Sequence, residues 1–514
     1  MFQGQSSAMV KSMDLPCSLP ANGAGDWPTT KQGGAEVAKY LMLQGVASNV
    51  GKSLLAAGLC RLFHQEGYKV APFKAWNMAL NSYMTPTGEI GRSQGIQAEA
   101  AGVLPTADMN PLLIKPTGAG ESQVVVQGRV REDLKLGEPL AEAAMPIVQE
   151  SLERLSREYE LIIMEGAGSP VEINLRHRDV ANMGTALMVQ APVMLVADID
   201  RGGALAALVG TMRLFRPKER ALVGGFILNK FRGDAEILQP ALTILEERGG
   251  RPVLGVVPYR HDLLIDEEDS LGLERISRGP GAINIGVFCL PYMSNYTDFT
   301  SLAREEGVAV HYIDRKEDLS PFDALIIPDT ENLREGLEFL ETQGYRAQMA
   351  LLIQAGVPTI GIGSGFIMLG QGNLGLLPLQ IESCSPGQAR AVRVQVAAKE
   401  GWLGRISGSQ VQGYLVHEAR TEGAARAFTL DGEPEGIQLG SILGTSLHGL
   451  FEDGRLRRAF INYLRERKNL PPLTGPILQG GQLRQEAYDR LAEQLRESLD
   501  IPAILDLVER SGRG

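Results

Sequence analysis

The stretch LQGVASNVGKSLLAAGL, residues Leu43–Leu59, is the most informative part of this 514-residue chain. An apolar run leads into a loop that contains Gly45 and Gly51, and Lys52 and Ser53 begin a helical pattern. The backbone N–H groups of such a loop point at an anion, and the dipole of the following helix adds to the attraction. Five residues separate the two glycines, one more than in the standard Walker pattern. The stretch therefore predicts a variant phosphate-binding loop between a strand and a helix.

A nucleotide site follows from this loop. We expect Lys52 to contact the β- and γ-phosphates of ATP and the Ser53 hydroxyl to ligate Mg²⁺. In LIIMEGAGSP, Glu165 directly follows an apolar strand, so its carboxylate is expected at the same sheet edge as a second magnesium ligand. The alternative is a solvated loop glutamate. The predicted nucleotide-binding set is Gly45, Asn49, Gly51, Lys52, Ser53, Asn229 and Lys230.

Two more strand ends carry candidate residues. Lys74, in APFKAWNMALNS, is placed to neutralise charge on a transferring phosphoryl group, with a surface lysine as the alternative. Asn229 and Lys230, in FILNKFRGD, end a further strand and are candidates for bordering the nucleotide base. An ordinary loop role is the alternative for this pair.

Residues 39–258 alternate apolar, strand-like runs with helical patterns, which predicts an α/β fold with a doubly wound parallel sheet. A charged and then glycine-rich stretch follows, and a second α/β rhythm begins at INIGVFCLP. Near the C-terminus, spacings of three and four between apolar residues predict an amphipathic helix. The predicted division is a disordered tail (1–38), an ATP-binding domain (39–262), a linker (263–281), a second α/β domain (282–465) and a C-terminal segment (466–514).

Composition excludes several classes of function. A net charge of −11 argues against non-specific binding to nucleic acid, and no apolar run is long enough for a membrane helix. The N-terminal residues lack the features of a signal peptide, and a cytoplasmic location is expected. The oligomeric state cannot be predicted from the sequence. The cysteines lie far apart without a CxxC pair, which favours neither a zinc site nor disulfides; they are Cys17, Cys60, Cys289 and Cys384.

Eight blocks, in order, resemble the cobyric acid synthase family. They are GVASNVGKS, APFKAWNMALNSY, IGRSQGIQAEAAGV, MNPLLIKPTG, SQVVVQGR, MEGAGSPVEINL, DIDRGG and NKFRGD. The similarity continues through SNYTDF, GTSLHGLF and YDRLAEQLRESLD, so it covers nearly everything after residue 39. The loop spacing matches the dethiobiotin-synthetase-like branch of P-loop proteins, and the second half is similar to class I glutamine amidotransferases.

The resemblance implies ATP-dependent amidation of peripheral carboxylates on a corrinoid, on the route to cobalamin. ATP would phosphorylate a carboxylate, and ammonia would displace the phosphate. Polar loops near the expected sheet edge are candidates for binding the corrinoid, because Arg and Asn suit carboxylate and amide groups. Trp76 departs from the family, which usually has glutamine there. The candidate substrate-binding residues are Asn77, Asn81, Glu99, Asn174 and Arg178.

The second half lacks the nucleophile that the resemblance implies. The family's elbow reads G-I-C-G-G-Y-Q-M-L-G, whereas this chain has GIGSGFIMLG, with Gly363 at the cysteine position. A cysteine thiolate there would attack glutamine, with a histidine as proton carrier. His448, in GTSLHGLF, keeps the histidine and is expected to be a remnant. The neighbouring Ser364 does not fit the spacing of a serine elbow and is not expected to replace the cysteine.

The segment for the oxyanion also departs from the family. P-G-S-K becomes PDTE, and the carboxylate of Asp329 near a developing oxyanion would repel it. GYLVHEAR keeps His417, also expected to be a remnant, and neither Cys289 nor Cys384 lies on an elbow pattern. Glutamine hydrolysis by this chain should therefore be close to absent.

Three hypotheses remain open. The first, which the intact phosphate loop favours, is a corrinoid amide ligase that uses free ammonia or ammonia from a separate glutaminase. The second is the same ligation chemistry on a different carboxylate. The third is a non-catalytic corrinoid- or nucleotide-binding protein that regulates an intact synthase.

Overall fold

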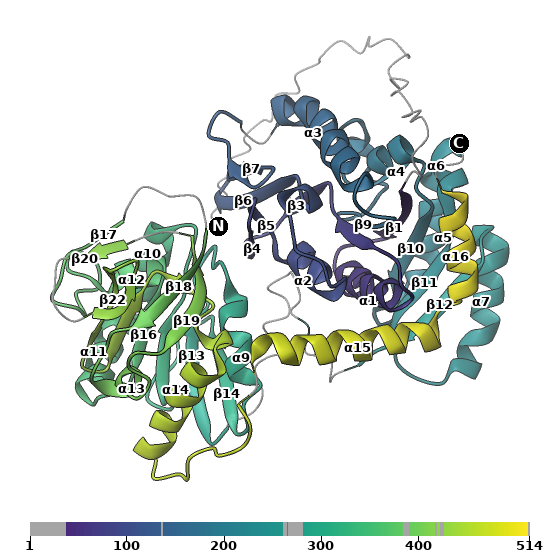
Figure 1. The fold of residues 1–514 in the computed structure, drawn as a ribbon. Helices are drawn as coiled ribbons and strands as arrows, with labels where there is room; N and C mark the ends of the chain where they lie inside the picture. The colour runs from purple at the N-terminus through teal and green to yellow at the C-terminus, as the bar shows by residue number, and fades with distance from the viewer. Residues whose placement is uncertain are drawn as a thin grey trace, which may run out of the picture.

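The structure is a computed structural model that describes residues 38–134, 137–260, 265, 281–383, 390–416, 419–421, 426–477 and 479–511. Two α/β domains lie side by side, and a long helix near the C-terminus runs from one to the other (Figure 1). The predicted tail before residue 38 and most of the predicted linker lie outside the described residues, as do Cys17, Cys384 and His417. In the described part of the chain, no helix has the length and apolar character that crossing a bilayer requires.

The first domain is built on a six-stranded parallel sheet, as the buried apolar runs predict. The strand β1, inside this sheet, leads into the phosphate loop, so the loop lies at the carboxyl edge. In spatial order the strands are β12 (Val253–Pro258), β11 (Val223–Phe231), β10 (Val193–Asp198), β1 (Lys39–Gly45), β9 (Leu161–Glu165) and β2 (Val70–Phe73).

Helices cover both faces of this sheet, and each face has its own apolar core. One face packs against α3 (Glu138–Ser156), α4 (Met183–Val189), α5 (Ala204–Leu214) and α7 (Ala235–Gly249), with the short α6 (Pro217–Leu222) beside them. The other face packs against α1 (Lys52–Gln65) and α2 (Arg92–Ala100).

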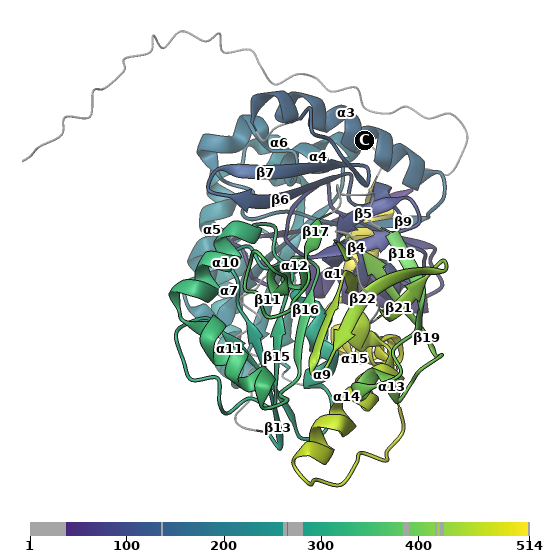
Figure 2. The same ribbon diagram turned by 90° about the vertical axis from the view of Figure 1, so that its left-hand side faces the viewer.

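Small β-elements extend the first domain toward the second, as Figure 2 shows. They are inserted between β2 and α3, a region for which the sequence predicted no separate sheet. A four-stranded sheet contains, in spatial order, β3 (Trp76–Met78), β6 (Leu112–Gly118), β7 (Glu121–Val126) and β8 (Arg129–Val130), and a hairpin pairs β4 (Ser82–Thr85) with β5 (Gly88–Gly91).

The second domain has a ten-stranded mixed sheet, whose first five strands are parallel. In spatial order they are β14 (Val308–Ile313), β13 (Ile283–Phe288), β15 (Ala324–Ile327), β16 (Thr359–Ile362), β23 (Ile442–Thr445), β22 (Glu433–Leu439), β21 (Arg426–Leu430), β18 (Arg390–Val396), β19 (Gln410–Leu415) and β24 (Leu447–His448). Beside it lie the short pair β17 (Ile381–Ser383) and β20 (Ala419–Thr421), and the helices α9 (Thr300–Ala303), α10 (Leu333–Thr342), α11 (Tyr345–Gln354), α12 (Ser364–Leu369), α13 (Gly401–Gly404) and α14 (Gly454–Arg467).

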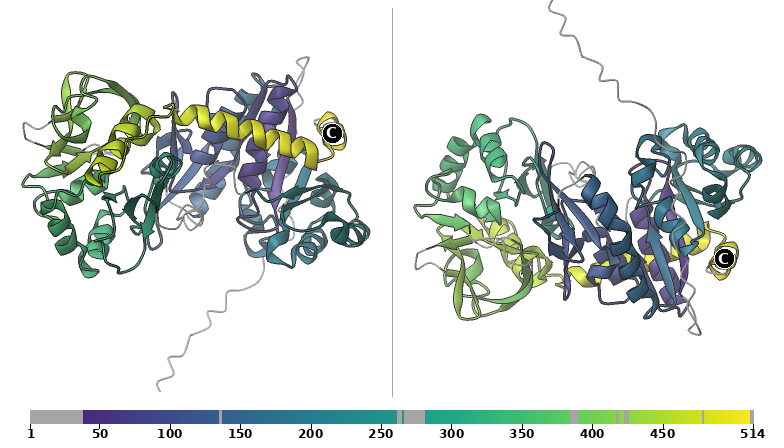
Figure 3. Two further views of the ribbon diagram at one scale, coloured as in Figure 1. Left: turned by 90° about the horizontal axis from the view of Figure 1, so that it is seen from below. Right: turned by 90° about the horizontal axis from the view of Figure 1, so that it is seen from above.

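The C-terminal helices α15 (Gly480–Ser498) and α16 (Ile501–Arg510) return to the first domain. Figure 3 shows α15 crossing beneath that domain from the second one. The apolar stripe expected on this helix is buried in the same core as α1 and the neighbouring strands; its members are Tyr488, Leu491, Leu495 and Leu499. The C-terminal segment is therefore part of the first domain's core although it follows the second domain in sequence.

Candidate active sites

The phosphate loop is held from a strand that ends nearby. Gly51 has φ +93°, and a Cβ on it would lie 2.2 Å from Nδ2 of Asn229, so glycine is required there. Asn229 uses that Nδ2 to donate a hydrogen bond of 2.8 Å to the carbonyl of Val50. Lys230 donates to the carbonyl of Asn49 at 2.6 Å. Asn229 and Lys230, at the end of β11, thus fix the loop.

Glu165 is the centre of a buried polar cluster at the carboxyl edge of the sheet. Its side chain accepts a hydrogen bond of 2.7 Å from Ser53 Oγ and pairs with Lys74 Nζ at 3.0 Å. Glu165 is 1% exposed and Lys74 4%, and a buried carboxylate is tolerated only when it is paired in this way. The structure therefore brings together three residues that the sequence predicted for the site, from α1, β9 and the end of β2.

Two glutamines, which the sequence analysis did not predict as site residues, complete this cluster. Nε2 of Gln97 lies 2.7 Å from Oε2 of Glu165, and Nε2 of Gln94 lies 3.4 Å from the same oxygen. Their spacing of three residues puts both on one face of α2. That spacing, inside the block IGRSQGIQAEAAGV, was the available signal, but a glutamine pair on a helix normally faces solvent.

Lys52 lies over the loop, 7% exposed, with Nζ 3.3 Å from the carbonyls of Ala47 and Gly168. The next residue, Ser53, contacts Glu165. A hydroxyl and a carboxylate oxygen 2.7 Å apart form a donor set that suits Mg²⁺, which usually takes one or two carboxylates and otherwise water and phosphate oxygens. Among the described residues no group of three or more Asp, Glu, His or Cys is arranged for a metal, so a magnesium ion here would depend on phosphate and water for its other ligands.

The predicted substrate residues lie in four different places. Nδ2 of Asn77 donates to Gln94 at 3.1 Å, which puts Asn77 next to the Glu165 cluster. Asn81 lies at the domain interface, where its Oδ1 accepts from the backbone N–H of Tyr296 at 3.1 Å. Asn174 and Arg178 are exposed on the 3₁₀ segment η2 (Ile173–Arg178).

The fourth place is that of Glu99, which contacts the C-terminal helix. Its carboxylate pairs with Arg484 at 2.9 Å and accepts from the hydroxyls of Tyr83 and Tyr488 at 2.7 and 3.1 Å. Arg484 and Tyr488 belong to α15, so these contacts anchor the C-terminal helix on α2.

The second domain keeps the backbone of a nucleophile elbow. Between β16 and α12, Gly363 has φ +59° and ψ −123°, and Ser364 is the first residue of the helix. A Cβ at residue 363 would lie 2.6 Å from Cγ of Asp329. The space that a cysteine side chain would need is therefore filled by the Asp329 carboxylate.

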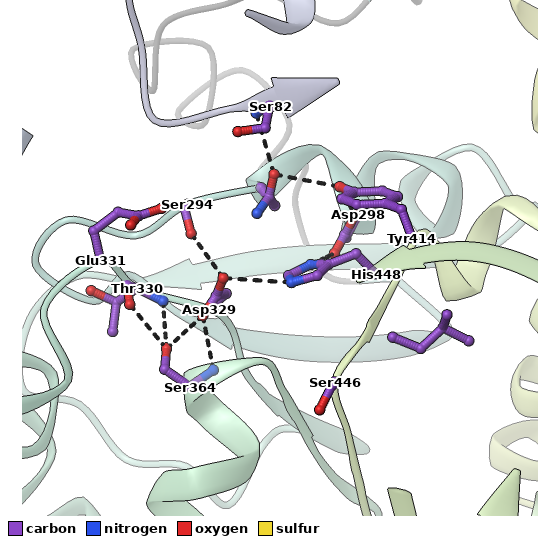
Figure 4. Close-up of polar contacts among 12 residues, drawn as sticks. Ser82, Ser294, Asp298, Asp329, Thr330, Glu331, Ser364, Tyr414, Ser446 and His448 are labelled. Atoms are coloured by element: carbon purple, nitrogen blue, oxygen red, sulfur yellow. Dashed lines mark hydrogen bonds and ion pairs between the residues drawn. The ribbon is translucent and has the colours of Figure 1, made fainter. Parts of the chain in front are cut away.

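Asp329 is 1% exposed, and its carboxylate accepts hydrogen bonds from Ser364 and Ser294 (Figure 4). Its Oδ1 accepts from the backbone N–H of Ser364 at 2.8 Å and from the Ser364 hydroxyl at 2.6 Å, and its Oδ2 accepts from Ser294 at 3.2 Å. The N–H after the elbow residue is the donor that a glutaminase would need for its oxyanion. Here that N–H is occupied by a carboxylate.

His448 lies between two carboxylates. Nδ1 is 2.8 Å from Asp298 and Nε2 is 3.5 Å from Asp329, and the ring stacks on Tyr414. Complete burial opposes the charged imidazole, but the negative charges of Asp298 and Asp329 outweigh it and raise the pKa of His448 to about 10. The raised pKa favours the charged imidazole at neutral pH, and a charged imidazole cannot accept a proton. Asp298, from η5 (Tyr296–Phe299), was missed as a site residue although it lies within the block SNYTDF.

Neither cysteine of the described residues lies on the elbow between β16 and α12. Cys60, on α1, is fully buried in the core, and Cys289, directly after β13, is half-buried. Burial raises the pKa of both thiols. Thiolate formation is therefore disfavoured at both positions.

The fold and these sites define a two-domain enzyme in which a P-loop nucleotide-binding domain is joined to a glutamine amidotransferase-like domain. Residues 41–271 match the CobQ/CobB/MinD/ParA nucleotide binding domain, and residues 284–456 match the CobB/CobQ-like glutamine amidotransferase domain. The chain belongs to the cobyric acid synthase family, which confirms the predicted fold class and the resemblance.

Curated relatives support this at nearly full length. Cobyric acid synthase of Desulfitobacterium hafniense is 42% identical over 503 residues, covering 92% of this chain and 98% of the relative. The same enzyme of Desulforudis audaxviator is 44% identical over 487 residues, with 90% and 98% covered. That of Dehalococcoides mccartyi is 39% identical over 508 residues, with 93% and 99% covered.

Proposed function

We propose that this chain catalyses ATP-dependent amidation of peripheral carboxylates on a corrinoid, adenosylcobyrinic acid a,c-diamide, to form cobyric acid, with ammonia that its second domain does not generate. Membership of the cobyric acid synthase family gives the reaction class, ATP-dependent amidation in cobalamin biosynthesis. The proposal that the ammonia does not come from the second domain is supported by the contrast between the two sites. The Ser53–Glu165–Lys74 cluster is complete, whereas a carboxylate fills the position of the glutaminase nucleophile.

In the first domain, the loop N–H groups and Lys52 would bind the triphosphate, and Lys74 would stabilise the charge that builds on the transferring phosphoryl group. Ser53 and Glu165 would hold Mg²⁺, which neutralises phosphate charge when it is bound. Gln94 and Gln97 keep the Glu165 carboxylate in one orientation, because both amides reach the same oxygen. Asn229 and Lys230 maintain the loop shape that this binding requires.

The candidates for corrinoid binding differ in their contact with this cluster. Asn77 is closest by contact, since it hydrogen-bonds to Gln94. Asn174 and Arg178 on η2 offer amide and guanidinium groups to the acidic periphery of the corrinoid. Asn81 and Glu99 are engaged in holding the second domain and α15, and we assign them to the wall of the site rather than to direct contact.

Three features of the second domain oppose glutamine hydrolysis. Gly363 offers no nucleophile, Asp329 occupies the donor that would stabilise an oxyanion, and His448 is held as a cation between carboxylates. The Ser364 hydroxyl donates to the carboxylate of Asp329, which is a weak base, and accepts from the backbone N–H of Thr330, so it is not paired with the imidazole of His448. Ammonia would come from solution or from a separate glutaminase, in the cytoplasm expected from the sequence.

The test compares nitrogen sources. Wild-type protein is incubated with ATP, Mg²⁺ and cobyrinic acid a,c-diamide, and phosphate release and amidated product are measured with ammonium or with glutamine. We expect turnover with ammonium and none above background with glutamine. Turnover with another carboxylate but not with the corrinoid would favour the second hypothesis. Binding of corrinoid without phosphate release would favour a regulatory role and contradict catalysis.

A further inference from the structure

A buried ion triad crosses the interface between the two domains. Nζ of Lys115 lies 2.9 Å from Glu331 and 3.1 Å from Glu89, and the side chains of Lys115, Glu331 and Glu89 are 1%, 3% and 6% exposed. Lys115 and Glu89 belong to β6 and β5 of the first domain, whereas Glu331 belongs to the segment after β15 in the second. Charges leave water at this depth only when partners compensate them, so the triad depends on the docked arrangement of the domains.

Direct hydrogen bonds flank the triad on the same interface. Nδ2 of Asn332 donates to the carbonyl of Thr117 at 3.0 Å. The backbone N–H of Ser82 donates to Oδ1 of Asn295 at 3.3 Å, and Figure 4 shows Ser82 of β4 facing the second domain's site. The Ser82 hydroxyl also donates to Glu89. The interface is therefore organised around the β4–β5 hairpin and β6.

On the ligase side, the triad connects to the cluster around Glu165. Glu89 lies on β5, which ends at Gly91, and the next residue begins α2 with its two glutamines. The N–H of Gly91 donates to Oδ1 of Asn110 at 2.9 Å, and Nδ2 of Asn110 donates to the carbonyl of Lys74 at 2.9 Å. The position of Glu89 is thus coupled to α2 through the chain at Gly91, and to Lys74 through the side chain of Asn110.

On the other side, the former glutaminase site fixes Glu331. Asp329, two residues earlier, is held by Ser294, Ser364 and His448. The backbone N–H of Glu331 donates to the carbonyl of Tyr292 at 3.1 Å. Glu331 therefore reaches the interface from a firmly held segment and adds a negative charge at a defined point.

We propose that Glu331 is a positioning residue for the amidation reaction, acting through Lys115 and Glu89 on the β4–β5 hairpin and the start of α2. The inference rests on the proposed ligase function. It assigns the second domain a role that does not require glutamine hydrolysis. The acid network that occupies the glutaminase site holds Glu331, and Glu331 keeps the substrate side of the ligase site in its productive arrangement.

The test measures ammonium-dependent amidation by E331A, E331Q and E331D against wild type, with E341A as the matched control. Glu341 is an exposed glutamate on α10 of the same domain. We expect kcat/KM for the corrinoid to fall by about tenfold or more in E331A, because small displacements of a positioned site reduce rates strongly. The affinity for ADP, measured by calorimetry, should remain unchanged, because Asn229 and Lys230 hold the phosphate loop independently. E331D should recover part of the loss, and E341A should behave as wild type.

Unchanged kinetics in E331A and E331Q would overturn the inference. So would a parallel loss of ADP affinity and corrinoid turnover, because that pattern indicates general destabilisation rather than positioning. If E331A does not fold, E331Q, which keeps the side-chain volume, decides the question by the same two readouts. Absence of ammonium-dependent turnover in wild type would instead contradict the proposed function itself.

Discussion

The carboxylate of Asp329 lies where a side chain on Gly363 would project, with its Cγ 2.6 Å from the position of a Cβ at residue 363. The same carboxylate accepts the N–H of Ser364 and faces the imidazole of His448. Asp329 thus fills the space that the family's cysteine side chain would need. It also accepts the backbone N–H and pairs with the imidazole that a thiolate at residue 363 would contact. Gly363, between β16 and α12, has the backbone conformation of an elbow.

This relationship predicts that the nucleophile cannot be restored alone. In G363C the new Cβ collides with Asp329, and a β-carbon in the backbone conformation of residue 363 carries strain of about 1–3 kcal/mol. We expect G363C to be less stable than wild type and to release no glutamate from glutamine. In G363C/D329G the collision and the opposing charge are both removed, and the introduced thiol should be alkylated faster by iodoacetamide than in G363C.

Mass spectrometry of the alkylated protein and denaturant melts check both variants, with D329G as the control for the loss of the carboxylate. Alkylation of G363C at the rate of the double variant, or glutamate release by G363C, would contradict the role assigned to Asp329.

A second prediction concerns the ligase site. K52A removes the ammonium group nearest the expected triphosphate, and turnover with ammonium should fall by about 10²–10³-fold, the usual loss when one preorganised donor is removed. K218A, on the exposed surface of α6 in the same domain, should keep wild-type turnover. Phosphate release with saturating corrinoid and ammonium is the measurement. Full activity of K52A would show that the triphosphate binds elsewhere.

A third prediction concerns the pH dependence of stability. The pKa of His448 is raised from 6.5 to about 10, so its ion pairs contribute stability that is fully present below pH 6.5 and is lost as the pH rises through 10. H448Q leaves Asp298 and Asp329 without their cation. We therefore expect wild type to exceed H448Q in unfolding free energy at pH 6 to 7, with the difference shrinking toward pH 10.

Urea denaturation of wild type and H448Q at pH 6, 8 and 10 measures this difference in unfolding free energy. The titration of groups other than His448 contributes to both proteins and cancels in the difference. A difference that is constant over this range would mean that His448 is not charged in the folded state.

The predictions that agree best with the structure are those whose evidence lies within one short segment of the sequence. The phosphate loop could be predicted because Gly45, Lys52 and Ser53 lie within a few residues of each other, and Glu165 because strand ends of a parallel sheet converge on one edge. Gln97 and Asp298 were missed because their roles depend on contacts with residues 68 and 150 positions away. We expected the negative charge of the PDTE segment to oppose an oxyanion. That the Asp329 carboxylate also fills the space of the cysteine side chain depends on the packing of two loops, which the sequence does not show.

The interface triad was beyond prediction from the sequence for a different reason. Lys115 lies in an apolar strand pattern, and Glu331 lies in a segment interpreted only for its effect on the oxyanion. Each charge would be unfavourable alone, and only the docked domains bring them together. Local patterns carry no information about such a pair.

The packing of α15 on α1 gives the last prediction. A Cβ on Gly58 would lie 2.4 Å from a methyl group of Leu495 and 2.9 Å from Cγ of Leu491, so the two helices are in close contact at this point. Leu495 is fully buried in the core of the first domain. L495A should therefore destabilise the first domain by about 2–5 kcal/mol, the usual cost of removing a buried leucine side chain.

E497A, an exposed position on the same helix, should change the stability by less than about 0.5 kcal/mol. Chemical denaturation, followed by fluorescence and by loss of ADP binding, measures the effect on the nucleotide-binding domain. Because α15 follows the second domain in sequence but completes the core of the first, L495A should weaken ADP binding at denaturant concentrations that leave the E497A protein folded. Equal stability of the two variants would mean that the first domain folds without its C-terminal helix.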